Sequence, residues 1–367
     1  MRLITSRENL LTAVNAASKA INPKSIIPVY AHVKLEAKDN NVILTGVNLE
    51  SSIECAVPAQ VEKEGSALIP AKLLGDIVRR LPEVSLTLET KDDAEIILRY
   101  ENSFFTLRTQ PDTDFPSLPS FKGGLEFSVE ADALRKLIRQ TFFAASLDDA
   151  KTIFTGLLWE IAKGELGIIG TDSHRLAWAR GPAAAGDETV EGSFVIPARI
   201  ASEVARLLQG EPCHIQADQN TVFFSFDQIK ITCRLMEGIY PAFRDVIPTD
   251  FVTCLKADSR QLSNSIERVS LFAASNEQSS IINFDITDTG VMTLHSRSKE
   301  GYGQEEMAVE ISGENLEIAF NGRYMSDMLK VTEAEKVEIK LSGKLSAGTM
   351  QAENDPLFLY LILPVRV

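Results

Sequence analysis

The sequence has few cysteines and no long apolar run. Its four cysteines, Cys55, Cys213, Cys233 and Cys254, are scattered over 367 residues without a C-x-x-C pair. This usage is typical of small buried side chains in a reducing compartment, and it argues against a disulfide framework or a zinc site. The longest apolar run is Phe358–Leu363, far shorter than the roughly 20 residues that span a bilayer. Charge also interrupts the N-terminus before a signal peptide could form. We therefore expect a cytoplasmic protein with no membrane partner.

The common signatures of catalysis are also missing. No G-x-S-x-G, Walker A or G-x-G-x-x-G element occurs in the chain. One stretch keeps a hydrolase-like alternative open, because Asp172, Ser173 and His174 supply an acid, a nucleophile and a base, with Arg175 beside them. Catalytic triads, however, are assembled by the fold from separate segments, and consecutive strand residues point to opposite faces. A turn in which Asp172 and Ser173 bond the local backbone is the simpler interpretation. We predict that the chain is not an enzyme and uses no cofactor or metal.

The chain has fewer basic than acidic residues. The chain has 37 Lys and Arg residues against 51 Asp and Glu, a net charge of -14 at pH 7, which by itself argues against binding nucleic acid by bulk electrostatics. The distribution of charge indicates otherwise, because six predicted helices together carry +7 and the rest of the chain carries -21. These helices are Arg7–Ala20, Ala71–Leu81, Ala131–Ala145, Ala198–Gln209, Asp258–Ala274 and Asn321–Val331.

A short apolar strand followed by an amphipathic helix occurs three times. The junction lies at Pro70, at Pro197 127 residues later, and at Asn321 a further 124 residues on. A spacing near one third of the chain indicates an internal repeat. Each third reads as helix, strands, helix, strands, which predicts an α+β fold with helices on one face of antiparallel sheets. The predicted domains are 1–121, 122–250 and 251–367.

The second helix of each repeat has an apolar stripe and a charged stripe. In the middle copy Ile200, Val204, Leu207 and Leu208 are predicted to pack on the sheet. Six basic helices on one side of a continuous sheet would form the positively charged inner wall of an arc, and two arcs close a ring. The alternative is a salt-bridged solvent face, with pairs worth about 0.3–0.5 kcal/mol each. The charged triplets are Lys72, Asp76, Arg79; Arg199, Glu203, Arg206; and Arg323, Asp327, Lys330.

Five short stretches follow one another in a diagnostic order: LTGVNLE (44–50), DFPSLP (114–119), TDSHRLA (171–177), YPAFRDVIP (240–248) and ILPVRV (362–367). Together with the length and the threefold repeat, they resemble the bacterial DNA polymerase III beta subunits, the β sliding clamps, over the whole chain. The resemblance implies a processivity factor, a ring closed by two subunits head to tail that encircles duplex DNA without reading its sequence.

The resemblance also implies a peptide groove between the second and third domains. Family members receive there short, largely apolar motifs from the replicative polymerase, the clamp loader and repair proteins. Ser173 stands where the family commonly has glycine, Asp245 where a base is frequent, and Leu363 and Val365 where methionine is frequent. Because branched side chains replace the flexible methionines, the pocket is expected to be stiffer and more selective. The implied groove residues are Thr171, Ser173, His174, Arg175, Leu176, Pro241, Val246, Leu361, Leu363, Pro364, Val365 and Arg366.

Basic residues on the helices are predicted to face DNA. Lys24 resembles a family position that reaches the duplex, with a solvated loop lysine as the alternative. The acids between the bases would temper the attraction, so that topology retains DNA while the ring slides. The predicted DNA-facing residues are Lys24, Lys72, Arg79, Arg135, Arg139, Arg199, Arg206, Arg260, Arg268 and Arg323.

The homodimer implied by the resemblance pairs an edge strand of the first domain with one of the third. The predicted strands are 104–109 and 304–309, with Arg108 meeting Glu305 or Glu306. In the alternative, Phe105 fills the core of its own domain. The predicted interface residues are Phe105, Leu107, Arg108, Leu271, Phe272, Glu305 and Glu306.

Overall fold

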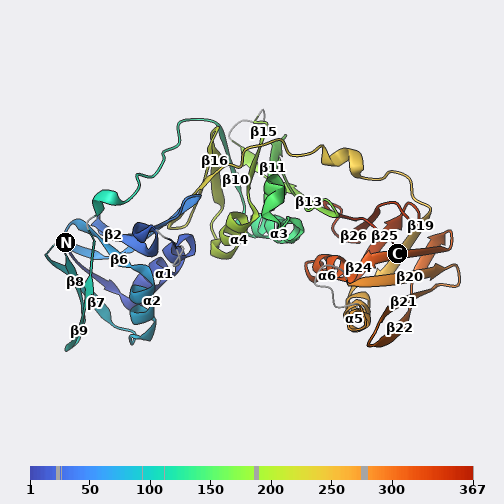
Figure 1. The fold of residues 1–367 in the computed structure, drawn as a ribbon. Coiled ribbons are helices and arrows are strands. Elements are labelled where there is room, and N and C mark those ends of the chain that lie inside the picture. The colour runs from blue at the N-terminus through green and yellow to red at the C-terminus, as the bar shows by residue number, and fades with distance from the viewer. Residues whose placement is uncertain are drawn as a thin grey trace. The chain divides into compact units, whose positions relative to one another are not determined.

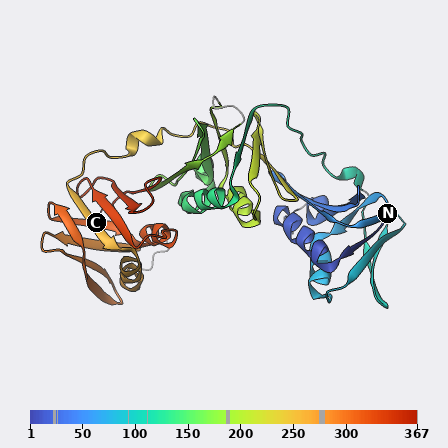
Figure 2. The same ribbon diagram turned by 180° about the vertical axis from the view of Figure 1, so that it is seen from behind.

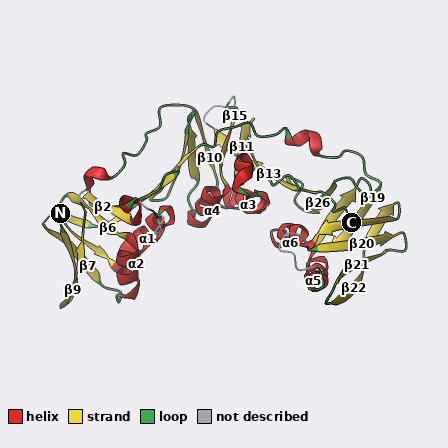
Figure 3. Ribbon diagram, in the orientation of Figure 1, coloured by secondary structure: helices red, strands yellow, loops and turns green. Residues whose placement is uncertain are grey.

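The computed structural model describes residues 1–21, 25, 27–92, 94–110, 112–185, 190–273 and 280–366. In these ranges the chain forms four sheets and six α-helices (Figure 3). Strands in each of the four sheets pair antiparallel, which confirms the predicted α+β class. The helices are α1 (Arg7–Ala17), α2 (Ala71–Arg80), α3 (Ala131–Thr141), α4 (Ala198–Leu207), α5 (Ser259–Ser270) and α6 (Gly322–Lys330).

All six predicted helices are confirmed to within a few residues at each end. Side-chain caps begin α1, α5 and α6: Ser6 accepts a hydrogen bond from the N–H of Asn9, Asp258 caps α5 and Asn321 caps α6. No helix of the described residues is long and apolar enough to cross a membrane.

Two compact units divide the chain, one comprising Met1–Leu134, Ala183–Val190 and Glu203–Leu235, the other Arg135–Pro182, Glu191–Ser202 and Met236–Val367. In the first unit, α1 and α2 pack against each other and lie on the same side of their sheets (Figure 1). Leu3, Leu10, Leu35 and Leu44 are fully buried between these layers.

The first unit holds two sheets. One has the order β5-β1-β7-β8-β9 and the other the order β14-β10-β16-β17-β18-β4-β3-β2-β6. Their strands are β1 (Arg2–Ser6), β2 (His32–Lys38), β3 (Asn41–Val47), β4 (Ser51–Pro58), β5 (Gln60–Lys63), β6 (Gly65–Pro70), β7 (Ser85–Asp92), β8 (Glu95–Tyr100), β9 (Ser103–Arg108), β10 (Leu125–Val129), β14 (Ala184–Ala185), β16 (Cys213–Ala217), β17 (Thr221–Phe226) and β18 (Ile229–Arg234).

The second unit holds the other two sheets. Their orders are β15-β11-β12-β13-β27-β26-β25-β19-β23 and β22-β21-β20-β24. In this unit α5 and α6 pack against each other, as the view from behind also shows (Figure 2). The strands are β11 (Gly156–Ala162), β12 (Glu165–Thr171), β13 (Arg175–Pro182), β15 (Gly192–Pro197), β19 (Thr253–Asp258), β20 (Ile281–Thr287), β21 (Val291–Ser298), β22 (Gly301–Ala308), β23 (Glu310–Gly313), β24 (Leu316–Asn321), β25 (Lys336–Leu341), β26 (Gly348–Ala352) and β27 (Phe358–Ile362).

Each nine-stranded sheet joins two thirds of the sequence. In the first unit β18 pairs with β4, with Ile229 opposite Cys55. In the second unit β13 pairs with β27, with Arg175 opposite Ile362. The strands of the middle repeat are therefore shared between the two units, each set continuing a neighbouring repeat's sheet.

Two glycines lie inside strands, close to the ends of helices α1 and α3. β3 continues past Gly46 and β12 past Gly170. A Cβ on Gly46 would lie 2.0 Å from the carbonyl oxygen of Ala17, and one on Gly170 would lie 2.4 Å from that of Thr141. Each glycine thus lets the last residue of α1 or α3 approach the strand, which is a close backbone contact rather than a turn.

The apolar stripe of α4 is confirmed, with one exception. Ile200, Val204 and Leu208 are buried, whereas Leu207 is half-buried at the edge of the stripe. Cys55, Cys213 and Cys233 are buried, as predicted, whereas Cys254 is half-buried.

Candidate functional site

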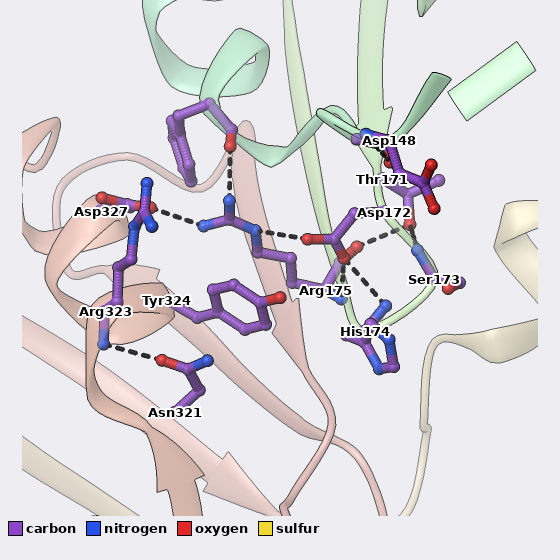
Figure 4. A network of polar contacts seen from close by, with 12 residues as sticks. Asp148, Thr171, Asp172, Ser173, His174, Arg175, Asn321, Arg323, Tyr324 and Asp327 are labelled. Carbon is purple, nitrogen blue, oxygen red and sulfur yellow. Dashed lines mark hydrogen bonds and ion pairs between the residues drawn. The ribbon is translucent and has the colours of Figure 1, made fainter. Parts of the chain in front are cut away.

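A tight turn between β12 and β13, residues 171–175 and here called the Asp172 turn, is held by its own side chains (Figure 4). Oδ1 of Asp172 accepts hydrogen bonds from the backbone N–H groups of His174 at 2.9 Å and Arg175 at 3.0 Å. The Thr171 hydroxyl donates to the Arg175 carbonyl oxygen at 2.6 Å. Ser173 has a φ of 77°, in the left-handed region that favours glycine. The turn therefore requires a positive φ at Ser173, the position where the resembled family commonly has glycine.

The side chains of Asp172, Ser173 and His174 do not form a triad. The Asp172 carboxylate contacts the backbone of His174, and its second oxygen accepts from Nε of Arg175 at 3.1 Å. The Ser173 hydroxyl accepts from the ammonium group of Lys151 at 2.9 Å. A triad requires the nucleophile to bond the imidazole and the acid to orient it. The turn interpretation accounts for these contacts, and the hydrolase alternative lacks its geometry.

Arg175 supports the Asp172 turn from inside the protein. Its side chain was predicted to line a groove, but the residue is only 8% exposed. Nη1 donates to Asp327 at 2.7 Å and Nη2 to the carbonyl oxygen of Phe143 at 2.7 Å, while the guanidinium lies 4.1 Å from the ring centre of Tyr324. The prediction is wrong for this side chain because its donors are used by buried acceptors.

Burial and nearby charges set the protonation of this cluster. Burial lowers the pKa of the Arg175 guanidinium, but the hydrogen bond to Asp327 and the negative charges of Asp172 and Asp327 outweigh it and raise the pKa overall. Burial raises the pKa of the Tyr360 hydroxyl, and burial together with Asp172 raises that of Tyr324. The cluster therefore holds a guanidinium cation beside phenols that stay neutral at neutral pH. Among the described residues no group of three or more His, Cys, Asp or Glu side chains is placed to hold a metal ion.

The C-terminal tail, residues 363–366, is fixed to two segments. The Leu363 N–H donates to the His174 carbonyl oxygen at 2.9 Å, and the Val365 N–H donates to that of Ala319 at 2.8 Å. The strand before it ends at Ile362, two residues before Pro364, which has no N–H to donate to a ladder. Leu363 is 40% exposed, Pro364 and Val365 are half-buried and Arg366 is exposed.

Pro241 and Val246 lie on the segment that leads from β18 to β19. Phe243 of this segment is buried. Arg244 donates two hydrogen bonds to Glu160 of β11, at 3.2 and 2.6 Å, and these contacts anchor the segment to the sheet. Pro241 and Val246 themselves are exposed.

An apolar cluster joins these segments. Leu176 and Leu361 are paired across β13 and β27, and each is only 3% exposed. They were predicted to line a groove, but both side chains are buried in the apolar cluster and do not reach the surface. The partly buried members of the cluster were not predicted from the sequence, although the aromatic residues of YPAFRDVIP could have indicated them. These members are Ile153, Trp178, Met236, Tyr240, Ile247 and Ala347.

The charged helix residues are mostly exposed. Lys24 lies outside the described residues. Arg135 is half-buried, and the exposed residues are Lys72, Arg79, Arg139, Arg199, Arg206, Arg260, Arg268 and Arg323. Arg268 donates two hydrogen bonds to Glu305. Asp327 was predicted to temper the bases of α6, and this is wrong because it faces Arg175.

Two strands form sheet edges where the dimer prediction needs them. β9 and β22 are each the last strand of their sheet in the part of the chain that the structure describes. Phe104 is 61% and Phe105 38% exposed, which argues against Phe105 as a core residue. Leu107 is 1% exposed, so its prediction as an interface anchor is wrong, since it packs in its own core.

Leu271 and Phe272 follow α5 beside β22. Leu271 is 76% and Phe272 36% exposed. The Phe272 ring lies over Gly303, where a Cβ would come within 2.3 Å of it. Arg108 and Glu306 are exposed. Glu305 forms an ion pair with Arg268 of the same chain, which corrects the prediction that Glu305 is a free partner for Arg108.

The threefold α+β repeat is the architecture of a clamp-type protein. Models of the DNA polymerase III beta subunit match residues 1–119 (N-terminal domain), 128–242 (central domain) and 244–366 (C-terminal domain). The beta sliding clamps of Staphylococcus epidermidis and Halalkalibacterium halodurans are each 30% identical to this chain, covering 100% of it and 99% and 100% of their own lengths.

Solved structures agree. The sliding clamp of Bacillus subtilis matches with a TM-score of 0.95 at 28% identity, covering 100% of this chain and 99% of that one. The Pseudomonas aeruginosa clamp bound to griselimycin matches with a TM-score of 0.94 at 28% identity, covering 100% of both chains. The chain belongs to the DNA polymerase III beta subunit family, and its function is that of a DNA sliding clamp.

Proposed function

We propose that two copies of this chain close head to tail around duplex DNA and tether the replicative polymerase, the clamp loader and repair proteins through short apolar motifs. The partners bind at the Asp172 turn, the segment carrying Pro241 and Val246, and the C-terminal tail. The clamp makes and breaks no bond and works in the cytoplasm. Its domains are 1–121, 122–250 and 251–367.

One contact carries the assignment of the protein-binding site. The hydrogen bond from Leu363 to His174 joins the end of the chain to the Asp172 turn. It sets the exposed Leu363 side chain beside exposed polar groups over a buried apolar cluster. An apolar anchor with a few polar groups around it suits a short motif of mainly apolar residues.

The edge strands β9 and β22 support the proposed dimer, because pairing them would cover two open edges at once. Exposed bases on the helices support DNA as the encircled partner, through contacts to phosphate that carry no sequence information. The pairs that Asp76 makes with Arg79 and Glu203 makes with Arg206 reduce the charge available for phosphate, which favours sliding over tight binding.

Griselimycin binding tests the protein-binding site, because griselimycin is bound to a related clamp. We expect calorimetry to show binding to the full chain, and Leu363→Asp to weaken it at least tenfold by placing a charge on an apolar contact. Leu49→Asp, at a leucine that is 68% exposed in the first unit, is the control and should leave the Kd unchanged. Equal Kd values for both variants would argue against the site.

Retention on DNA tests the ring. A clamp loaded onto nicked circular duplex should stay bound at high salt and be lost when the DNA is linearised, because topology rather than charge holds it. Linear DNA that retained the clamp as durably as circular DNA would contradict encirclement.

A further inference from the structure

The acid of the third helix triplet has a different partner from its counterparts. Asp76 and Glu203 each pair with an arginine three residues later on their own helix, at 3.4 and 2.8 Å. Asp327 occupies the same repeat position in α6, but its Oδ2 accepts a 2.7 Å hydrogen bond from Arg175. This acid therefore pairs with the residue that supports the Asp172 turn rather than with a base of its own helix.

Helix α6 holds Arg175 from two directions. Asp327 binds the guanidinium by a hydrogen bond, and Tyr324, three residues earlier on the same helix, presents its ring 4.1 Å away (Figure 4). A planar, delocalised guanidinium can use both contacts at once. Because Arg175 is only 8% exposed, water screens these interactions weakly. The orientation of Arg175 therefore depends on α6.

Arg175 in turn fixes the orientation of the Asp172 carboxylate. Its Nε donates to Oδ2 of Asp172 at 3.1 Å, while Oδ1 of the same carboxylate accepts the backbone N–H groups of His174 and Arg175. Both oxygens of Asp172 are engaged, so the carboxylate cannot rotate without losing hydrogen bonds. A continuous path of bonds thus runs from Asp327 through Arg175 and Asp172 to the backbone of His174.

The C-terminal tail and the strand before it are bonded to both the Asp172 turn and α6. The His174 carbonyl oxygen accepts from Leu363, and the Tyr360 hydroxyl donates to the carbonyl oxygen of Tyr324 in α6 at 2.9 Å. The turn, α6 and the last strand are therefore fixed relative to one another by directional bonds. A change at Asp327 reaches both exposed parts of the proposed site.

We propose that Asp327 is a positioning residue of the protein-binding site. By holding Arg175 it fixes the Asp172 turn, and with it the direction of the His174 side chain and the acceptor that anchors Leu363. Asp327 acts through Arg175 and Asp172 rather than by touching the partner. The inference rests on the proposed function, because it explains the affinity of that same site.

Asp327→Asn tests this, since it keeps the side-chain shape and removes the charge. We expect griselimycin binding at least tenfold weaker by calorimetry, and a shift in the imidazole NMR signals of His174, assigned with His174→Gln. The matched control is Asp76→Asn, the same change at the same repeat position, which should alter neither. Adding Asp327→Asn to Arg175→Ala should weaken binding no further, because both changes interrupt one path.

The outcomes are separable. If the wild-type chain binds griselimycin but Asp327→Asn keeps its Kd and its His174 signals, the positioning role is overturned while the proposed site stands. It is also overturned if binding falls only in proportion to the unfolded fraction, with the His174 signals unchanged. If the wild-type chain binds no griselimycin, the proposed site fails and the inference with it. Should Asp327→Asn not fold, Tyr324→Leu removes the second hold on Arg175 without changing charge, and the same two measurements decide.

Discussion

The backbone N–H of Leu363 donates a 2.9 Å hydrogen bond to the carbonyl oxygen of His174, although 189 residues separate them in the sequence. The bond continues the β13–β27 ladder, in which Arg175 lies opposite Ile362. The path of the last residues is therefore set by the middle third of the chain, and the Asp172 turn and the tail behave as one surface.

Deletion of residues 363–367 should abolish partner binding while the chain still folds. β27 ends at Ile362, so its ladder survives, and the loss of two backbone hydrogen bonds costs about 1–3 kcal/mol. Griselimycin titration and thermal unfolding followed by circular dichroism would measure the two effects. Leu363→Ala, which keeps the backbone bond, should bind more weakly than wild type but better than the deletion. A truncated chain with wild-type Kd would contradict the role of the tail.

Gly46→Ala and Gly170→Ala should destabilise the fold. The new methyl groups would meet the carbonyl oxygens of Ala17 and Thr141 at 2.0 and 2.4 Å, and relief of such overlap costs about 1–3 kcal/mol or more. Urea unfolding would measure the loss. Gly210→Ala is the matched control, because its Cβ would meet nothing within 4 Å; it should be neutral or slightly stabilising. Equal stability of all three variants would show that the helix ends move freely.

Periodicity and repeat spacing predicted much of the fold. The stripe of Ile200 and Val204 identified a helix face from local pattern alone, and the recurrence of the pattern located equivalent helices elsewhere. Local pattern could not predict that sheets would join across repeats, because the pairing of Ile229 with Cys55 depends on strands far apart in sequence. Neither strand signals its partner by its own composition.

Side-chain partners at the site were less predictable for the same reason. Asp327 occupies the same repeat position as Asp76 and Glu203, yet its partner Arg175 is 152 residues away. Alternation along β9 predicts that Phe105 and Leu107 share a face. Alternation does not show how far the core extends along an edge strand. Leu107 lies within the core and is buried, whereas Phe105 lies beyond it and is exposed.

The ion pair of Glu305 with Arg268 should make stability depend on acid pH. The hydrogen bond from Arg268 lowers the pKa of Glu305 below its ordinary value of 4.5. A group whose pKa is lowered by folding stabilises the folded state above its unfolded pKa, and this is lost as pH falls through the folded pKa. Glu305→Gln should therefore have a slightly lower Tm than wild type at pH 7 and an equal one in strong acid. Glu300→Gln, at an exposed turn residue, is the control. A difference that persists unchanged in strong acid would rule out the ion pair as its cause.

Leu271→Glu combined with Phe272→Glu should convert the proposed dimer into monomers. Leu271 is 76% exposed, and Phe272 covers Gly303 of the edge strand β22, so two carboxylates here would be desolvated on pairing with β9. Sedimentation equilibrium should give the single-chain mass of 40.4 kDa for the double variant and twice that for the wild type. Leu271→Glu alone should weaken the dimer without touching Gly303, which separates an interface effect from damage to β22. Leu147→Glu, at a leucine that is 91% exposed outside the predicted interface, should remain dimeric. A double variant that keeps the wild-type mass would show that the subunits meet elsewhere.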